Sequence, residues 1–113
     1  MVQHSLPVMF ELAKRGEISF EEVIDKMCHA PADVFRIDNR GYLRKGYKAD
    51  IVIVEKQPWT VTKDNIRYKC GWSPLEGVTL TYKVRTTIVN GRTVYDNGAI
   101  DENARGELLT FHP

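Results

Sequence analysis

Three histidines and two cysteines are the side chains of this 113-residue chain with the most distinctive chemistry. His4, His29 and His112 form neither a His-x-His nor a His-x-x-x-His pair, and no group of His, Asp and Glu has the spacing of metal ligands. Cys28 and Cys70 show no Cys-x-x-Cys spacing, so we expect two reduced, buried thiols rather than a disulfide scaffold. The sequence alone therefore predicts no catalytic residue and no metal ligand.

His29 and the two tryptophans could each mark a ligand site, but a structural interpretation is favoured for each. His29 follows Cys28, and residues one step apart on a helix point in different directions, so we expect a histidine held by polar contacts at a helix end. Trp59 and Trp72 could line a ligand pocket, but packing of their rings between elements is the favoured interpretation.

Charged residues nearly balance, because 16 Lys and Arg stand against 15 Asp and Glu and give a formal net charge of +1. The basic footprint of a protein that binds nucleic acid or an anionic membrane is therefore absent. No apolar run approaches the ~18 residues that a membrane span needs, and the N-terminus lacks a signal-peptide pattern. The composition predicts a cytoplasmic domain, with neither nucleic acid nor a membrane among its partners.

The first third of the chain has the periodicity of helices. An apolar stripe predicts a helix over residues 5–16, with Ser5 as its N-cap. A capping box over residues 19–22, Ser-Phe-Glu-Glu, predicts the start of a second helix with a continuous apolar face. Residues 30–35 are predicted to form a short third helix with Pro31 in its first turn.

The rest of the chain has the pattern of β-strands. Residues 49–54 are β-branched and apolar on both faces, which predicts a strand covered on both sides and ended by Pro58. Residues 82–89 and 92–95 have strand patterns on either side of Asn90-Gly91, the dipeptide most typical of a tight hairpin. A second Asn-Gly turn predicts one further short strand.

These elements make an incomplete α+β domain. Three strands of useful length cannot close a sandwich or a barrel, so the sheet has bare edges and an uncovered face. The helices likewise need a further surface against which to bury their apolar stripes. The architecture is typical of a piece of a larger fold.

Residues 41–53 carry the most specific motif, glycine-x-aliphatic-x-x-glycine-x-x-Ala-Asp-aliphatic-Val. Gly41 and Gly46 allow backbone angles that are closed to other residues. Asp50, next to Ala49 at the start of the apolar strand, is expected to cap local backbone amides, so all four residues are assigned a structural role. The pattern resembles the segment at which metal-dependent amidohydrolases leave their barrel and re-enter a small β-sandwich.

Within that superfamily the chain is similar to dihydroorotases over almost its whole length. The segments that carry this resemblance are residues 2–6 (Val-Gln-His-Ser-Leu), 27–35, 70–77 (Cys-Gly-Trp-Ser-Pro-Leu-Glu-Gly) and 84–91. The first resembles the chain just after the active-site loop of the last barrel strand. On this resemblance Gln3 and His4 are candidates for positions adjacent to substrate, and a polar contact beside the helix start is the alternative for His4.

The resemblance implies a fold and a chemistry for the whole protein. Residues 1–38 would be the last helices of a (β/α)₈ TIM barrel of roughly 250 residues, and residues 39–113 an incomplete part of the amidohydrolase β-sandwich. Dihydroorotases interconvert N-carbamoyl-aspartate and dihydroorotate in pyrimidine synthesis. Their binuclear zinc site uses a His-x-His pair, a carboxylated Lys, two further His and an Asp. This chain has no counterpart of that ligand set.

We therefore expect an α+β fragment, the C-terminal part of a zinc-dependent dihydroorotase, which itself holds no cofactor and is inactive alone. Its partners would be the remainder of the barrel and further copies in a homo-oligomer. The alternatives are a cyclic amidohydrolase of the hydantoinase or allantoinase kind and a non-catalytic amidohydrolase-like scaffold protein. The residues that precede this sequence would discriminate among the three, since an Asp-His-Ala-Pro-type strand end favours dihydroorotase.

Overall fold

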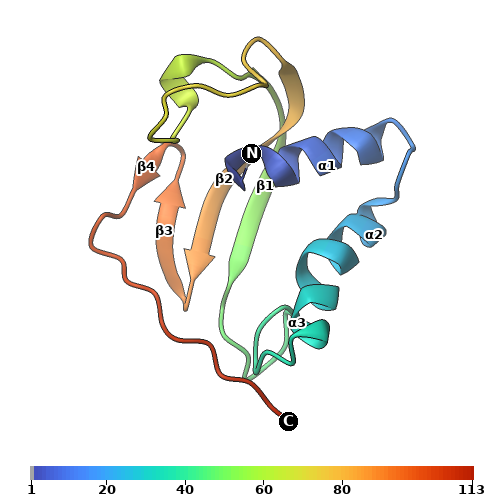
Figure 1. The fold of residues 1–113 in the computed structure, drawn as a ribbon, viewed down its shortest axis with the longest axis vertical. Helices are drawn as coiled ribbons and strands as arrows, with labels where there is room; N and C mark the ends of the chain where they lie inside the picture. Colours follow the sequence, from blue (N-terminus) through green and yellow to red (C-terminus); the bar gives the residue numbers. More distant parts are fainter. Residues whose placement is uncertain (1) are drawn as a thin grey trace.

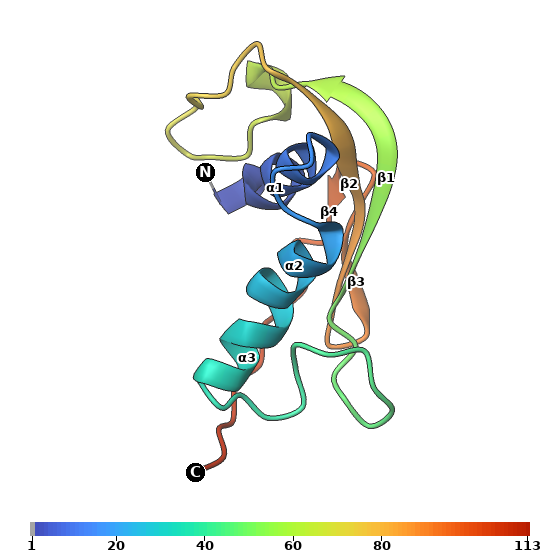
Figure 2. The same cartoon turned by 90° about the vertical axis from the view of Figure 1, so that its right-hand side faces the viewer.

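A computed structural model describes residues 2–113 of the chain. Four strands form one antiparallel sheet in the order β1-β2-β3-β4, and the helices lie together on one side of it (Figures 1 and 2). The strands are β1 (Ile51–Thr60), β2 (Thr79–Val89), β3 (Arg92–Asp96) and β4 (Ala99–Ile100). The helical segments are η1 (Val2–His4), α1 (Ser5–Lys14), α2 (Phe20–Ile24), η2 (Asp25–His29), α3 (Ala30–Val34) and η3 (Lys63–Asn65). The predicted α+β class is confirmed.

Helix α1 begins without the N-cap that the sequence predicts. Ser5 lies inside the first turn, and its hydroxyl donates a hydrogen bond to the Val2 carbonyl oxygen at 3.0 Å. The prediction is wrong because the 3₁₀ turn η1 already winds the chain before Ser5, so the hydroxyl closes that turn instead of capping a free amide.

Helices α2 and α3 are joined through η2, a segment of π-helix, and form one continuous rod instead of two separate helices. Ser19 is the predicted N-cap and accepts a hydrogen bond from the Glu22 amide at 3.0 Å. The Glu22 carboxylate accepts from the Ser19 hydroxyl at 3.3 Å, not from its backbone. Because Pro31 lacks an N–H and its ring crowds the preceding turn, a wider π turn before it keeps the rod continuous.

Strand β1 is longer and more exposed than predicted. It continues past Pro58 to Thr60, with a register irregularity between Lys56 and Trp59. A proline is tolerated there because β1 is an edge strand and the irregularity removes the need for a ladder bond. Val52 and Ile53 are each 45% exposed, so the prediction of a strand covered on both faces is wrong for these residues. Val52 lines the spaces left between the sheet and the helices, and Ile53, as the next residue of the strand, points to the opposite side, which no helix covers (Figure 2).

Both predicted Asn-Gly turns are present. Asn90 and Gly91 have φ of 54° and 77° between β2 and β3, and Asn97 and Gly98 have φ of 44° and 93° between β3 and β4. Two successive residues with positive φ match the right-handed twist of the strands they connect.

The core lies where α1 and α2 cross the first half of β2. Phe10, Phe20 and Tyr82 pack edge to face there, with ring centroids 5.3–5.7 Å apart. The Thr81 amide donates to the Glu11 carboxylate at 2.9 Å, which lowers the pKa of Glu11. The buried apolar side chains of the core in residues 2–113 are Ala13, Val23, Ala32, Val61 and Leu80. None of the helices in residues 2–113 has the length and hydropathy needed to cross a bilayer.

Candidate functional site

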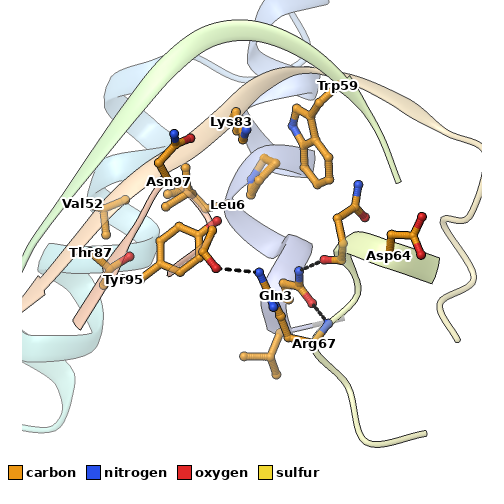
Figure 3. A pocket seen from close by; sticks show the side chains of 15 residues that line it. Gln3, Leu6, Val52, Trp59, Asp64, Arg67, Lys83, Thr87, Tyr95 and Asn97 are labelled. Carbon is orange, nitrogen blue, oxygen red and sulfur yellow. Dashed lines mark hydrogen bonds between the residues drawn. The ribbon is translucent and has the colours of Figure 1, made fainter. Parts of the chain in front are cut away.

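A cavity of about 460 Å³ opens between the N-terminal segment, the loop after η3 and the helix-facing side of the sheet (Figure 3). Its walls come from separate elements, since Leu6 lies on α1, Trp59 on β1, Lys83 on β2, Tyr95 on β3 and Arg67 on the loop. The volume lies in the range of small-molecule sites. This cavity is the candidate site that the fold assembles.

Gln3 lines the cavity, and its side chain is fully engaged with the loop backbone. Its Nε2 donates to the Asn65 carbonyl oxygen at 2.7 Å, and its Oε1 accepts from the Arg67 amide at 2.8 Å (Figure 3). The Gln3 backbone amide donates to the Tyr68 hydroxyl at 3.1 Å. Gln3 therefore fixes the position of the loop relative to the N-terminal segment.

His4, the neighbouring candidate, is completely buried. Its ring contacts Trp59 and Tyr68, with centroid distances of 5.8 and 5.7 Å. Among the residues that the structure describes, neither ring nitrogen has a hydrogen-bond partner. Burial lowers the pKa of His4, so the ring is held neutral. The structure brings Gln3 and His4 to one seam between residues 2–4 and 65–68, called here the N-terminal seam.

The polar groups around the cavity suit binding better than catalysis. Arg67 donates from Nη2 to the Gly98 carbonyl oxygen at 2.8 Å, which draws the loop onto the β3–β4 turn. Lys83 adds a second cation, and Asp64 supplies one carboxylate. Among the described residues that line the cavity, there is no serine, cysteine or histidine to act as nucleophile or base.

Gly41 and Gly46, the glycines of the sequence motif, lie in the loop between α3 and β1. Both have φ of +86°, the conformation that the sequence predicts for them. A Cβ atom added to Gly41 would lie 2.5 Å from Ala32 Cβ and 2.8 Å from the Cys28 carbonyl oxygen, whereas Gly46 faces open space. Gly41 therefore permits the loop to contact the helical rod.

Asp50 connects three segments of the chain. Its Oδ1 accepts a hydrogen bond from the Asn90 amide at 2.9 Å, and its Oδ2 is paired with Arg40. The carbonyl of Ala49 accepts from the Gly91 amide at 3.0 Å. Asp50 thus does cap a backbone amide, but that amide belongs to the β2–β3 turn and not to the local segment as predicted.

The remaining histidines and cysteines lie apart from the cavity. His29 stacks on Tyr42 at 4.2 Å, and the hydrogen bond from Tyr42 to Asp33 raises the pKa of the phenol. His112 contacts Asp38 at 2.8 Å. Both cysteines are free and exposed, which corrects the prediction of buried thiols. Cys28 lies beside the incompletely filled space between the helical rod and β1, and Cys70 lies in the long loop between β1 and β2.

The described part of the chain does not fit a zinc centre. Residues 2–113 contain no group of three or more His, Cys, Asp or Glu side chains placed to hold a metal ion. The donor set that the family resemblance implies therefore has no counterpart in these residues.

The cavity residues Arg67, Lys83 and Tyr95 could not be found from the sequence. They lie on a loop and two strands, and no motif or spacing joins them before the chain folds. Gln3 and Trp59 are the lining residues that the sequence analysis singled out. The indole N–H of Trp59 donates to the Tyr82 carbonyl oxygen at 2.7 Å.

A second, larger space of about 800 Å³ separates the helical rod from β1. The side chains around it are mainly apolar and include Phe10, Ile24, Met27 and Val54. The helical layer and the sheet are therefore incompletely packed against each other within the described residues.

Comparison with known proteins agrees with this architecture. Residues 9–95 match the model of the amidohydrolase family. The dihydroorotase of Pyrococcus furiosus is 35% identical over 109 residues, which are 96% of this chain and 26% of that protein. The allantoinase of Bacillus velezensis is 40% identical over 109 residues, 96% of this chain and 24% of that protein.

Solved structures show the same fold. L-hydantoinase (dihydropyrimidinase) from Arthrobacter aurescens superimposes with a TM-score of 0.78 at 29% identity, over 85% of this chain and 22% of that one. A D-hydantoinase structure gives a TM-score of 0.77 at 21% identity, which shows the fold alone. The chain spans about a quarter of the length of the curated relatives it matches. With the family model matching most of its length, the chain belongs to the amidohydrolase family.

Proposed function

We propose that this chain is the C-terminal part of a dihydroorotase-type cyclic amidohydrolase. Residues 1–38 would supply the last helices of its barrel, and residues 39–113 would supply part of its β-sandwich. One observation carries the proposal: 96% of the chain matches 26% of a dihydroorotase. A quarter-length match without a group of metal-binding side chains among residues 2–113 is what a structural portion of such an enzyme would give.

The chain's own contribution would be to support the rest of the enzyme. The apolar space between the helical rod and β1 and the free edge of β1 are the surfaces available to further barrel and sandwich elements. Val52 and Ile53 remain 45% exposed, and each large apolar side chain removed from water contributes roughly 1.5–3 kcal/mol. We propose the remainder of the barrel as the partner that covers them.

The reaction of the whole enzyme would be the reversible ring closure of N-carbamoyl-aspartate to dihydroorotate in pyrimidine biosynthesis, in the cytoplasm. Two zinc ions, when bound by residues outside this chain, would supply Lewis-acid activation of the cyclic amide. Gln3 would act by holding the N-terminal segment against the loop at Asn65 and Arg67. A role of Gln3 and His4 next to substrate stays part of this proposal.

An allantoinase or hydantoinase is the second candidate. The allantoinase relative has the higher identity, 40% against 35% for the Pyrococcus furiosus dihydroorotase. A hydantoinase structure also superimposes well. A non-catalytic amidohydrolase-like scaffold would share the same fold.

The test is to read the codons that precede this sequence in the same frame and express the longer protein they encode. Hydrolysis is then measured on dihydroorotate, allantoin and a hydantoin under identical conditions. The proposal expects dihydroorotate to have the highest kcat/KM. A higher kcat/KM for allantoin or the hydantoin would favour the second candidate, an allantoinase or hydantoinase. No turnover of any of the three substrates would favour the non-catalytic scaffold.

A further inference from the structure

Protonation of His4 is incompatible with the environment of its ring. In the N-terminal seam the imidazole is completely buried between Trp59 and Tyr68 without a hydrogen-bond partner among the described residues. A charged imidazolium in this place would lose its hydration and gain no acceptor. The neutral ring, by contrast, loses less on burial and packs well against two aromatic rings.

We propose that the N-terminal seam is an acid-sensitive latch: protonation of His4 expels the ring and releases residues 2–4 from the loop at 65–68. The open form would lose the three hydrogen bonds that Gln3 makes with Asn65, Arg67 and Tyr68. Opening would also displace one wall of the 460 Å³ cavity, because Gln3 and Trp59 both line this cavity.

The charged groups around the seam do not compensate the proton. Tyr68 is the titratable side chain in ring contact with His4, and the positive charge of the N-terminal ammonium further opposes protonation of the ring. Asp64 and Arg67 from the loop and Lys83 from β2 line the neighbouring cavity, where two cations face one carboxylate. On α1, the Glu11 carboxylate is engaged by the Thr81 amide. On β1, Glu55 pairs with Arg85. No carboxylate among the described residues forms an ion pair with His4, so the proton has no counter-charge there.

The sign of the pH effect follows from the two states of the ring. An exposed histidine has a pKa of about 6.5, and burial lowers the pKa of His4 in the closed seam. Above pH 6.5 both states are neutral and the seam is closed. As the pH falls below 6.5, the open state takes up the proton more readily, so its population rises. The population of the open state at pH 5 can exceed that at pH 7.5 by roughly thirtyfold at most, because the exposed ring of the open state has a pKa of about 6.5.

The opening can be local because α1 has anchors of its own. Its second half is held by Phe10 in the aromatic cluster and by Glu11 and Lys14, which bind the Thr81 amide and hydroxyl at 2.9 and 3.0 Å. None of these contacts involves the seam. Residues 2–4 can therefore separate from the loop while the helix remains on the sheet.

Hydrogen exchange of single amides in the 113-residue chain tests the proposal. The Gln3 and Arg67 amides report on the seam, because their acceptors are the Tyr68 hydroxyl and the Gln3 side chain. The Thr81 and Gly91 amides report on the rest of the fold. Rates are compared at about pH 5 and about pH 7.5 after correction for the intrinsic pH dependence of exchange, across the range in which histidine titrates.

The expected result is faster corrected exchange of the seam amides at pH 5, by up to about thirtyfold, with the Thr81 and Gly91 amides unchanged. The variant His4→Phe, which retains an aromatic ring but cannot be protonated, should abolish this acceleration, and His112→Gln should retain it. Equal acceleration of all four amides would mean global unfolding and would overturn the latch, as would no acceleration at the seam. Because the comparison is internal to the unmodified chain, it decides the matter even where His4→Phe does not fold.

Discussion

Gly41 and Gly46 offer a matched pair for measuring how closely the motif loop approaches the helical rod. Both have φ of +86°, so Gly→Ala carries the same backbone penalty at each position, about 1–2 kcal/mol for the left-handed conformation. Alanine also restricts the unfolded chain more than glycine does, which offsets about 0.4–1 kcal/mol of this penalty at each of the two positions. Gly46→Ala should therefore lower the free energy of unfolding by no more than about 1.6 kcal/mol.

Gly41→Ala adds a steric clash to that common penalty. The new Cβ would lie 2.5 Å from Ala32 Cβ and 2.8 Å from the Cys28 carbonyl oxygen, and neither the helix backbone nor the buried Ala32 side chain can rotate away. Overpacking of this kind costs about 1–3 kcal/mol. We expect Gly41→Ala to be less stable than Gly46→Ala by that amount, or by roughly 4–12 °C in Tm for a chain of this size.

The assay is urea denaturation followed by circular dichroism, with both variants and the unmodified chain at one protein concentration. In the background of Gly41→Ala, the further change Ala32→Gly should cost less stability than it does alone, since it removes one of the two clashing partners. Equal destabilisation by Gly41→Ala and Gly46→Ala would refute the close approach. So would strict additivity of the double variant.

Three further outcomes are expected. Asp50→Ala should lower the free energy of unfolding by about 0.5–2 kcal/mol, because the Asn90 amide loses its acceptor. The control is Glu55→Ala, which removes an exposed ion pair and should change the free energy of unfolding by less than about 1 kcal/mol. Deletion of residues 106–113 removes the ion pairs of Glu107 and the β-bridge at Ile37, so limited proteolysis should cut faster within residues 36–48. The control variant Leu108→Ala changes a side chain that is 96% exposed and should leave the digestion pattern unchanged. Self-association through the free edge of β1 should give a mass above that of the monomer in light scattering at roughly 100 μM. Ile53→Lys should lower this mass, since a charge on an edge strand opposes strand pairing. A clean monomer of the unmodified chain would contradict the free edge as an association surface.

Local signals predicted the elements well where one physical cause dominates. Asn-Gly turns, the Ser19 cap and the positive φ of Gly41 and Gly46 depend on a few adjacent atoms, and the structure confirms each. Where a neighbouring element determines the local structure, the prediction from the sequence was wrong or incomplete. Pro58 lies within β1 because an edge strand tolerates a missing donor. Pro31 does lie in the first turn of α3, as predicted, but the π turn that joins this helix to α2 was not predicted, because propensity does not encode it.

The cavity was beyond local reasoning for a different reason. Arg67, Lys83 and Tyr95 meet only after the loop and two strands are placed by contacts such as the Gln3 bonds to the loop, which span more than 60 residues of sequence. The burial of His4 has the same origin. A histidine beside a helix start gives no sign in sequence that Trp59 and Tyr68 will enclose it.

The central claim, that this chain contributes structure and not catalysis to a cyclic amidohydrolase, is tested most directly by one measurement on the purified 113-residue chain. Hydrolysis of dihydroorotate is assayed with zinc supplied, and bound metal is determined on the same sample. The account predicts turnover no higher than the blank and no stoichiometric zinc. Turnover above the blank together with roughly two zinc ions per chain, as a binuclear hydrolytic centre requires, would contradict it.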